Sequence, residues 1–542
     1  MLSYRKLAMR VLGRPLHTEG IDSPRPASQR AAALVLTAAM LTTLAAPAFA
    51  DIWRIEDGDI TVKAGETEGT NKVSQGTNKD VVDTNTIITN QNKDTTSSHT
   101  VTIETNDKND KVEVTLKDVN IDTSSRNNAA VSVTGSCNTT IKLDGDNALK
   151  SDTYRSGIAS TGSLTISGGE NDSLTAQGGS GANGISSSGS LTISGGTVTA
   201  NGDDGGRGIS SSGSVTISGG STVTANGGSG TISGGDGIWS GGGVTISGGS
   251  TVTANGGNGG SLVGGDGIRS GGGLTVSDGT VTAKGGNGDS KDGYGGDGIR
   301  SGGGVTISGN TVNAAGGNGG KVGGYGICSF DRVAISGGTV EAAGGNGSTG
   351  GGSGIYSSVI DLSGSLELTA KAGSPTGKAL LQNGRELDLD TIKDKLGPGA
   401  KVTATDANGD SKQVSIPRPV EPEEPVIPEE SSSSSDGGSA TPSAPVSPLP
   451  GLTVTDKDGQ RISYTSTQSG NTLTVCVGRF TASFRISLAA LRQLRAEGIE
   501  TIAFQTVLCS TSLSVDELLA MGGEDAEAVL THRLTDSSLT VG

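Results

Sequence analysis

Three aspartates recur at one position of a repeated Gly-Ile motif, and their spacing could create an acidic site. Asp236, Asp266 and Asp297 each stand two residues before the isoleucine of that motif. If successive repeats stack, these carboxylates lie about 5 Å apart, where like charges repel by a few kcal/mol at an intermediate dielectric. Water can screen them, their pKa values can rise, or a hard cation can bind between them. The pattern leaves two interpretations open: a calcium site, or a row of solvated aspartates in turns.

A second row stands one residue after the same isoleucine. Trp239, Arg269, Arg300 and Tyr356 occupy it on a surface otherwise composed of Ser, Thr and Gly. Because alternate residues of a strand face opposite sides, these four should point outward when the isoleucine points inward. Exposed aromatic rings stack on sugars, and arginine binds a carboxylate through two parallel hydrogen bonds. We therefore predict that these four residues bind carbohydrate. The alternative is that they are scattered surface residues without a role.

A third row consists of asparagines that follow another patch of the repeat. We expect these amides to be structural and to bond along the stack. The row comprises Asn258, Asn287, Asn318 and Asn346.

The sequence offers little for catalysis. Its three histidines, His17, His99 and His532, lie far apart, which argues against a Ser-His-Asp or Cys-His hydrolase and against a histidine-rich metal site. The many Gly-x-Gly strings belong to turns of the repeat and do not indicate a phosphate-binding loop. A polysaccharide lyase or hydrolase would need clustered acidic or basic residues, and only Asp331 and Arg332 mark a local irregularity. We predict that the protein is not an enzyme.

The elements that must position these rows are internal repeats. A Gly-Ile motif recurs every 24 to 31 residues. Each copy also carries a Leu/Val-Thr-Ile-Ser patch and a Thr-Val-Thr-Ala patch, separated by Gly-Gly, Ser-Gly or Asn-Gly turn signals. The isoleucines of the motif are Ile158, Ile185, Ile209, Ile238, Ile268, Ile299, Ile327 and Ile355.

Each patch has the two-residue alternation of a strand. In the third patch, Val252 and Ala254 would face inward while Thr251 and Thr253 face outward. The patches are too short and too rich in glycine for helices. Since each repeat can bury its apolar residues only by stacking on the next, the sequence predicts an all-β, right-handed parallel β-helix with three short strands per coil of about 28 residues.

Composition changes divide the rest of the chain. Residues 1–50 combine basic residues, a short apolar run and Ala48-Phe49-Ala50, which predicts a cleaved signal peptide. We expect an N-terminal cap and first coils over 51–111, the β-helix with its C-terminal cap over 112–416, and a disordered Pro/Glu/Ser linker over 417–450. No later segment is apolar enough to span a membrane. The protein is therefore expected to be secreted, and it could be associated with the cell surface.

Residues 451–542 have the composition of a small α+β domain that could contact a surface partner. Ser487 is a predicted N-cap for a helix over 488–494, with Gly498 as its C-cap, and Ser514 begins a second helix. Cys476 and Cys509 could pair in an oxidising compartment, or both could remain free thiols.

The charge balance argues against nucleic acid as a partner. The whole chain has a net charge of −16, and removing residues 1–50, which hold six basic and two acidic residues, leaves −20. Nucleic-acid binding depends on lysines and arginines that displace counterions from phosphates. A strongly acidic chain lacks that driving force but favours solubility.

The repeats from Val112 to about Ala372, including Gly157-Ile158 and Ser163-Leu164-Thr165-Ile166-Ser167-Gly168-Gly169, resemble those of the secreted β-helix carbohydrate-binding proteins of anaerobic bacteria. That family shares the pectate-lyase-like superfamily fold. The resemblance implies non-catalytic binding of plant-type or acidic polysaccharide, with bound calcium. It covers about half of the chain, and no individual ligand residue can be transferred from it.

The leading functional prediction is thus an extracellular, non-catalytic carbohydrate-binding protein. The alternative is an adhesin or structural surface stalk, in which the β-helix is a spacer and residues 451–542 make the contact.

Overall fold

The computed structural model describes residues 52–105, 111–136 and 138–417, and most of 451–541, where 457–459, 463, 470, 478–480, 507–509, 522–525 and 533–536 are excepted. The predicted signal peptide, nearly all of the predicted linker, Cys137 and Cys509 lie outside the described residues. The chain divides between residues 422 and 423 into two units, which are described separately.

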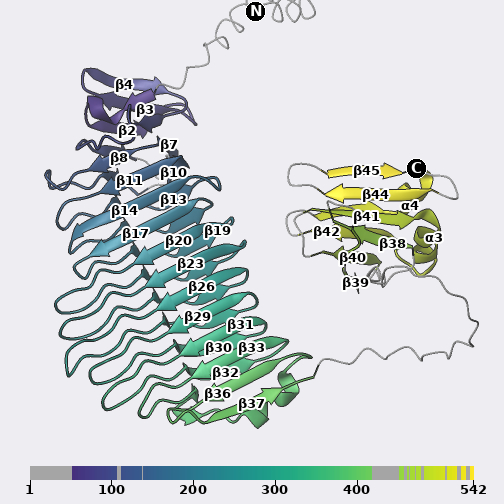
Figure 1. The fold of residues 1–542 in the computed structure, drawn as a ribbon. Helices are drawn as coiled ribbons and strands as arrows, with labels where there is room; N and C mark the ends of the chain where they lie inside the picture. Colours follow the sequence, from purple (N-terminus) through teal and green to yellow (C-terminus); the bar gives the residue numbers. More distant parts are fainter. Residues whose placement is uncertain are drawn as a thin grey trace, which may run out of the picture. The chain divides into compact units, whose positions relative to one another are not determined.

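The first unit is a parallel β-solenoid of about 13 turns, in which most turns contribute three short strands (Figure 1). The predicted fold class is confirmed. The two-residue alternation determines which side chains face the interior. In the strand Ser250–Asn255, Val252 and Ala254 are fully buried, whereas Thr251 is exposed. The inward side chains are small or branched, and each coil removes them from water only by packing against the coils before and after it. Their burial provides the main stabilisation.

The pairing of strands between coils forms three ladders along the solenoid, of which the third, from β11 to β36, can be followed in Figure 1. The Gly-Ile ladder comprises β2 (Ile60–Ala64), β6 (Val101–Glu104), β9 (Val131–Thr134), β12 (Ile158–Ser160), β15 (Ile185–Ser187), β18 (Ile209–Ser211), β21 (Ile238–Ser240), β24 (Ile268–Ser270), β27 (Ile299–Ser301), β30 (Ile327–Ile335), β32 (Ile355–Leu362) and β34 (Leu380–Gln382). The second ladder comprises β1 (Ile52–Arg54), β5 (Ile87–Thr89), β7 (Lys111–Lys117), β10 (Asn138–Asp144), β13 (Leu164–Ser167), β16 (Leu191–Ser194), β19 (Val215–Ser218), β22 (Val244–Ile246), β25 (Leu274–Val276) and β28 (Val305–Ile307), and continues into β30 and β32. The third comprises β8 (Asn120–Asp122), β11 (Asp146–Lys150), β14 (Ser173–Ser180), β17 (Thr197–Asp203), β20 (Thr222–Asn226), β23 (Ser250–Asn255), β26 (Gly279–Lys284), β29 (Thr311–Ala315), β31 (Gly338–Ala343), β33 (Leu366–Lys371) and β36 (Lys401–Thr405).

The register between coils turns sequence positions into columns. Ile238 pairs with Ile268, and Ile268 pairs with Ile299. One residue later, Trp239, Arg269 and Arg300 pair in the same succession. The predicted rows of equivalent side chains therefore exist as continuous columns along the stack.

The Gly-rich segments between the third strand and the next Gly-Ile strand also stack on one another. Isolated bridges join the glycines in the first part of each loop, a few residues after the third strand: Gly230, Gly259, Gly288 and Gly319. Approach between coils is very close: a Cβ on Gly265 would lie 1.9 Å from the carbonyl oxygen of Gly235. Only glycine permits this packing.

Antiparallel strands cover both ends of the stack. At the N-terminal end, β3 (Asn71–Gln75) pairs with β2, and β4 (Asn78–Asp83) pairs with β3, while η1 (Ile55–Asp57) follows β1. At the other end, β37 (Ser411–Ser415) pairs with β36 and β35 (Arg385–Glu386) pairs with β34, next to η2 (Leu389–Lys395). Such caps protect strand edges that would otherwise be open to pairing.

Among its described residues, the second unit contains two four-stranded sheets and two helices around a core of its own. The predicted helix is α3 (Leu488–Ala496), and the Ser487 hydroxyl accepts the N–H of Ala490 as its N-cap. The second helix is α4 (Val515–Met521). The sheets contain β38 (Leu452–Thr455), β41 (Ala482–Ser487), β44 (Glu527–His532) and β45 (Ser537–Val541), and β39 (Thr465–Ser469), β40 (Thr472–Cys476), β42 (Thr501–Gln505) and β43 (Ser510–Ser514).

Candidate functional site

The aspartate ladder is defined as Asp236, Asp266 and Asp297. Each residue lies at the end of a Gly-rich loop, two residues before a Gly-Ile strand begins. One carboxylate oxygen of each residue accepts the backbone N–H of the equivalent residue one coil later. Asp236 Oδ1 accepts from Asp266 N at 2.9 Å, and Asp266 Oδ1 accepts from Asp297 N at 2.7 Å. Tyr325 N donates to Asp297 Oδ1 at 2.7 Å and ends the ladder. The three aspartates are only 4–7% exposed, so they are not the solvated turn residues of the second interpretation.

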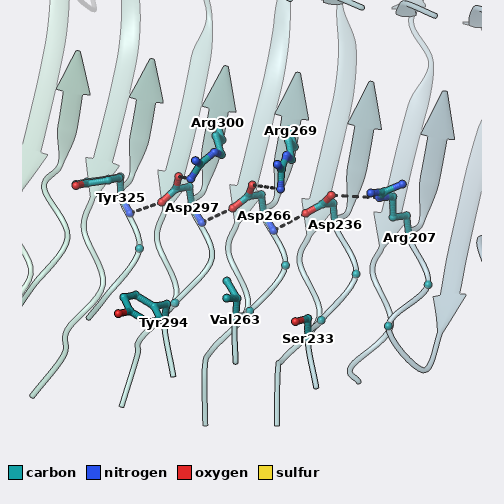
Figure 2. Close-up of a pocket in the computed structure, with 18 of the residues that line it drawn as sticks. Arg207, Ser233, Asp236, Val263, Asp266, Arg269, Tyr294, Asp297, Arg300 and Tyr325 are labelled. Atoms are coloured by element: carbon teal, nitrogen blue, oxygen red, sulfur yellow. Dashed lines mark hydrogen bonds and ion pairs between the residues drawn. The ribbon is translucent and has the colours of Figure 1, made fainter. Parts of the chain in front are cut away.

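The other carboxylate oxygen of each aspartate faces an arginine (Figure 2). Arg207 Nε lies 3.3 Å from Asp236 Oδ2, and Arg300 lies 3.2 Å from Asp297 Oδ2. Arg269 is looser, at 3.9 Å from Asp266 Oδ2. In the sequence analysis, the acidic row and the outward row are interpreted as two separate sites. The structure brings Arg269 and Arg300 from the outward row against the aspartates, because both rows flank the same corner of the coil.

Burial controls the electrostatics of this corner. Desolvation and the neighbouring carboxylates of Asp297 and Asp236 raise the pKa of Asp266 to about 8. Desolvation likewise raises the pKa of Asp297, against the backbone hydrogen bond from Tyr325 and the charge of Arg300. At neutral pH the aspartate ladder therefore carries less than its full negative charge, whereas the arginines remain charged.

These residues border a groove of about 740 Å³, called the ladder groove, that crosses successive coils. Its floor contains the aspartate ladder and bare glycine backbone. Figure 2 shows Arg269 and Arg300 on one side of the aspartates, Ser233, Val263 and Tyr294 on the other, and Arg207 at the end of the aspartate row. Tyr294 and Val263 are 43% and 40% exposed, so one wall is charged and the opposite wall is partly apolar.

Trp239 and Tyr356 lie beside the ladder groove but are not among the residues that line it. The guanidinium of Arg207 lies over the Trp239 ring, 4.3 Å from its centroid. Tyr356 stacks on Tyr325 with their ring centroids 5.2 Å apart. Each predicted aromatic residue therefore supports a neighbour that does line the groove.

Calcium, which the resemblance implies, does not fit the aspartate ladder. One oxygen of each carboxylate accepts a backbone N–H, and the other faces a guanidinium group. A cation approaching Asp297, for example, would have to displace the positive charge of Arg300. Within the described ranges, no three Asp, Glu, His or Cys side chains are grouped so that they could hold a metal ion.

The asparagine ladder, Asn258 with Asn287, Asn318 and Asn346, forms the predicted bonds along the stack. The side-chain oxygens of the first three accept the backbone N–H of the next asparagine, as from Asn287 N to Asn258 Oδ1 at 2.8 Å, and Asn346 Oδ1 accepts from Ser374 N. The bond thus joins side chain to backbone instead of amide to amide. A true amide ladder exists elsewhere, from Asn255 to Asn226 to Asn201, and the sequence interpretation missed it.

The apolar wall and Arg207 were also missed as binding residues. Ser233, Val263, Tyr294 and Val322 each stand three residues before the aspartate ladder position. That constant offset is a signal in the sequence, but it falls inside loops where no strand pattern draws attention to it. Their stacking depends on bridges such as Val263 to Tyr294, which only the folded loops reveal.

The remaining sequence-based candidates stay apart from the ladder groove. Arg332 pairs with Asp361 on the next coil, outside the groove. His99 contacts the Ile55 carbonyl oxygen near the N-terminal end, and His532 is buried in the second unit, where burial lowers its pKa. The thiol of Cys476 is free and donates to Gln505 Oε1 at 3.4 Å, whereas Cys509, with which it could pair, lies outside the described residues.

Comparison of the chain with protein-family models, with curated proteins and with solved structures gives no match. In the part of the chain that the structure describes, no helix has the length and apolar character needed to cross a bilayer.

Proposed function

We propose that the protein is an extracellular, non-catalytic carbohydrate-binding protein that holds a polysaccharide, plant-type or acidic, along the ladder groove. The observation that carries the proposal is the pairing of two unlike walls along successive coils. The partly exposed heads of Arg269 and Arg300 face Tyr294 and Val263 across the groove. A sugar has an apolar ring face and polar edges, which suit one wall each. The family resemblance of the repeats supports the same function.

Binding of the full chain to an array of plant polysaccharides tests this proposal. We expect at least one polysaccharide to bind, and we expect the double variant Arg269→Ala/Arg300→Ala to lower its affinity by about tenfold or more. Arg332→Ala removes an exposed, paired arginine outside the groove and should leave binding unchanged. Failure of the chain to bind any polysaccharide would contradict the proposal.

The second candidate is an adhesin or surface stalk that uses residues 451–542 for contact. It is favoured by the independent core of the second unit, in which Phe484 and Phe504 pack with ring centroids 4.7 Å apart. Because that core is built from residues of the second unit alone, a contact made by this unit would not require the ladder groove. Binding to a surface that survives Arg269→Ala/Arg300→Ala but is lost on deleting residues 451–542 would favour this candidate.

A further inference from the structure

The arginines of the ladder groove have hydrogen-bond donors left over. The side chains of Arg207, Arg269 and Arg300 are 36%, 50% and 37% exposed. A guanidinium group has five N–H donors and no acceptor. The shortest contact of each arginine to its aspartate uses one nitrogen, so N–H groups remain for a ligand.

The aspartates have little left to offer a ligand. Their side chains are only 5–9% exposed, and both oxygens of each already face a donor. The groove therefore presents donors and positive charge to solvent, while its acceptors and negative charge are buried behind them. A complementary ligand must supply acceptors.

The guanidinium groups are spaced at one per coil. Arg207 reaches forward to Asp236 on the following coil, whereas Arg269 and Arg300 pair with the aspartate of their own coil. Arg269 and Arg300 pair on adjacent strands, at the inter-strand spacing of about 4.8 Å, and the side chain of Arg207 reaches Asp236 on the coil before them. This spacing is comparable with the length of one sugar residue in an extended glycan.

We propose that the ladder groove binds, without a metal ion, a linear glycan with one carboxylate per sugar, and that successive carboxylates face Arg207, Arg269 and Arg300. This inference rests on the proposed function and specifies its ligand and its independence of calcium. Asp236 and Asp297 accept hydrogen bonds from Arg207 and Arg300 and hold these two guanidinium groups in place. The Trp239 ring beneath Arg207, and the Phe330 ring 5.3 Å from Arg300, further restrict the guanidinium groups before a ligand arrives.

The test measures binding of the full chain to short oligogalacturonates and to the same oligomers as methyl esters. Each probe is measured in EDTA and in calcium chloride. The ester keeps the sugar backbone but removes the negative charge. We expect the acid form to bind equally well in EDTA and in calcium, and the ester to bind at least about tenfold more weakly. Added salt should weaken binding of the acid form, because screening reduces the attraction to partly exposed guanidinium groups.

Two variants connect the ligand to the arginines. Arg300→Gln should weaken binding of the acid form, whereas the matched Arg332→Gln should not. Arg300→Lys retains the charge and the fold but loses the planar fork, so we expect it to bind the acid form more weakly than the parent.

The outcomes separate this inference from the proposed function. Equal binding of acid and ester would overturn the inference and retain carbohydrate binding. Binding of the acid only in calcium chloride would also overturn it, in favour of a calcium site. If neither probe binds and the polysaccharide array is also empty, the proposed function itself fails.

Discussion

The aspartate ladder and the asparagine ladder make the same bond to the backbone in different surroundings. In both, a side-chain oxygen accepts the N–H of the equivalent residue one coil later, at 2.7–2.9 Å. The aspartates are almost fully buried, whereas Asn258, Asn318 and Asn346 are exposed to solvent. The acidic side chain therefore occupies the position where a charge is harder to accommodate.

The difference shows that the negative charge is not needed for stacking. Asn183 stands at the aspartate ladder position, and its side-chain oxygen accepts the N–H of Arg207 at 2.8 Å. An amide thus performs the backbone role there. What distinguishes Asp236, Asp266 and Asp297 is that the second oxygen of each also faces a guanidinium group, so these carboxyl groups position the arginines of the ladder groove.

Substituting Gly265 should disrupt both ladders at once and cause the largest loss of stability. Gly286, on the asparagine side, donates to Gly265 O, and Gly296, on the aspartate side, donates to Gly286 O. A Cβ on Gly265 would clash with Gly235 O at 1.9 Å. We expect Gly265→Ala to lower the free energy of unfolding of the solenoid by about 3 kcal/mol or more, measured by chemical denaturation. Gly309→Ala, whose Cβ would meet nothing closer than 3.6 Å, is the control and should have little effect.

The aspartate ladder should make stability depend on pH, whereas the asparagine ladder should not. The pKa of Asp266 is raised from 3.8 to about 8 on folding, so between these values the folded state binds more protons than the unfolded chain. Its contribution to stability is therefore greatest below pH 4 and decreases as pH rises to about 8. The slope is at most about 1.4 kcal/mol per pH unit. In Asp266→Asn that decrease should vanish. Thermal unfolding of both proteins at several pH values should therefore show the variant becoming more stable relative to the parent as pH rises. An unchanged difference across this range would contradict the raised pKa.

Removing the acceptor should cost more in the buried ladder than in the exposed one. Asp297→Ala leaves the N–H of Tyr325 and the guanidinium of Arg300 without their partner, and we expect a loss of about 1–3 kcal/mol. Asn318→Ala frees the N–H of Asn346, which water can reach, so the loss should stay below about 0.5 kcal/mol. Denaturant titration measures both, and equal losses would show that burial does not distinguish the ladders.

Introducing a charge into the exposed ladder should have the smallest effect. Asn287→Asp keeps the acceptor for Asn318 N and adds a carboxylate that remains in contact with solvent. We expect a stability change within about 0.5 kcal/mol and no added pH dependence between pH 5 and 8. Thermal unfolding at both pH values tests this, and a marked fall at pH 8 would mean that the position is less solvated than the structure indicates.

The fold was predictable because its signal is repeated. Ile238, Ile268 and Ile299 recur with their flanking glycines, and each strand patch repeats the alternation seen in Val252 and Ala254. Helix α3 was predictable from local chemistry, since Ser487 caps it as the sequence indicates. The pairing of Asp236 with Arg207 was not predictable, because an arginine at the aspartate ladder position of one coil reaches the next coil only through its side-chain conformation.

The sequence alone determined which residues repeat, and therefore which side chains share a column, because pairing in register follows from the need of each coil to bury its inward face. Only the tertiary structure decided that the column of Asp266 and the column of Arg269 meet at one corner, and that a wall containing Tyr294 stands opposite. The physical reason is that the path of a glycine-rich loop is set by its packing on the loops before and after it. The loop sequence has no hydrophobic periodicity from which that path could be predicted.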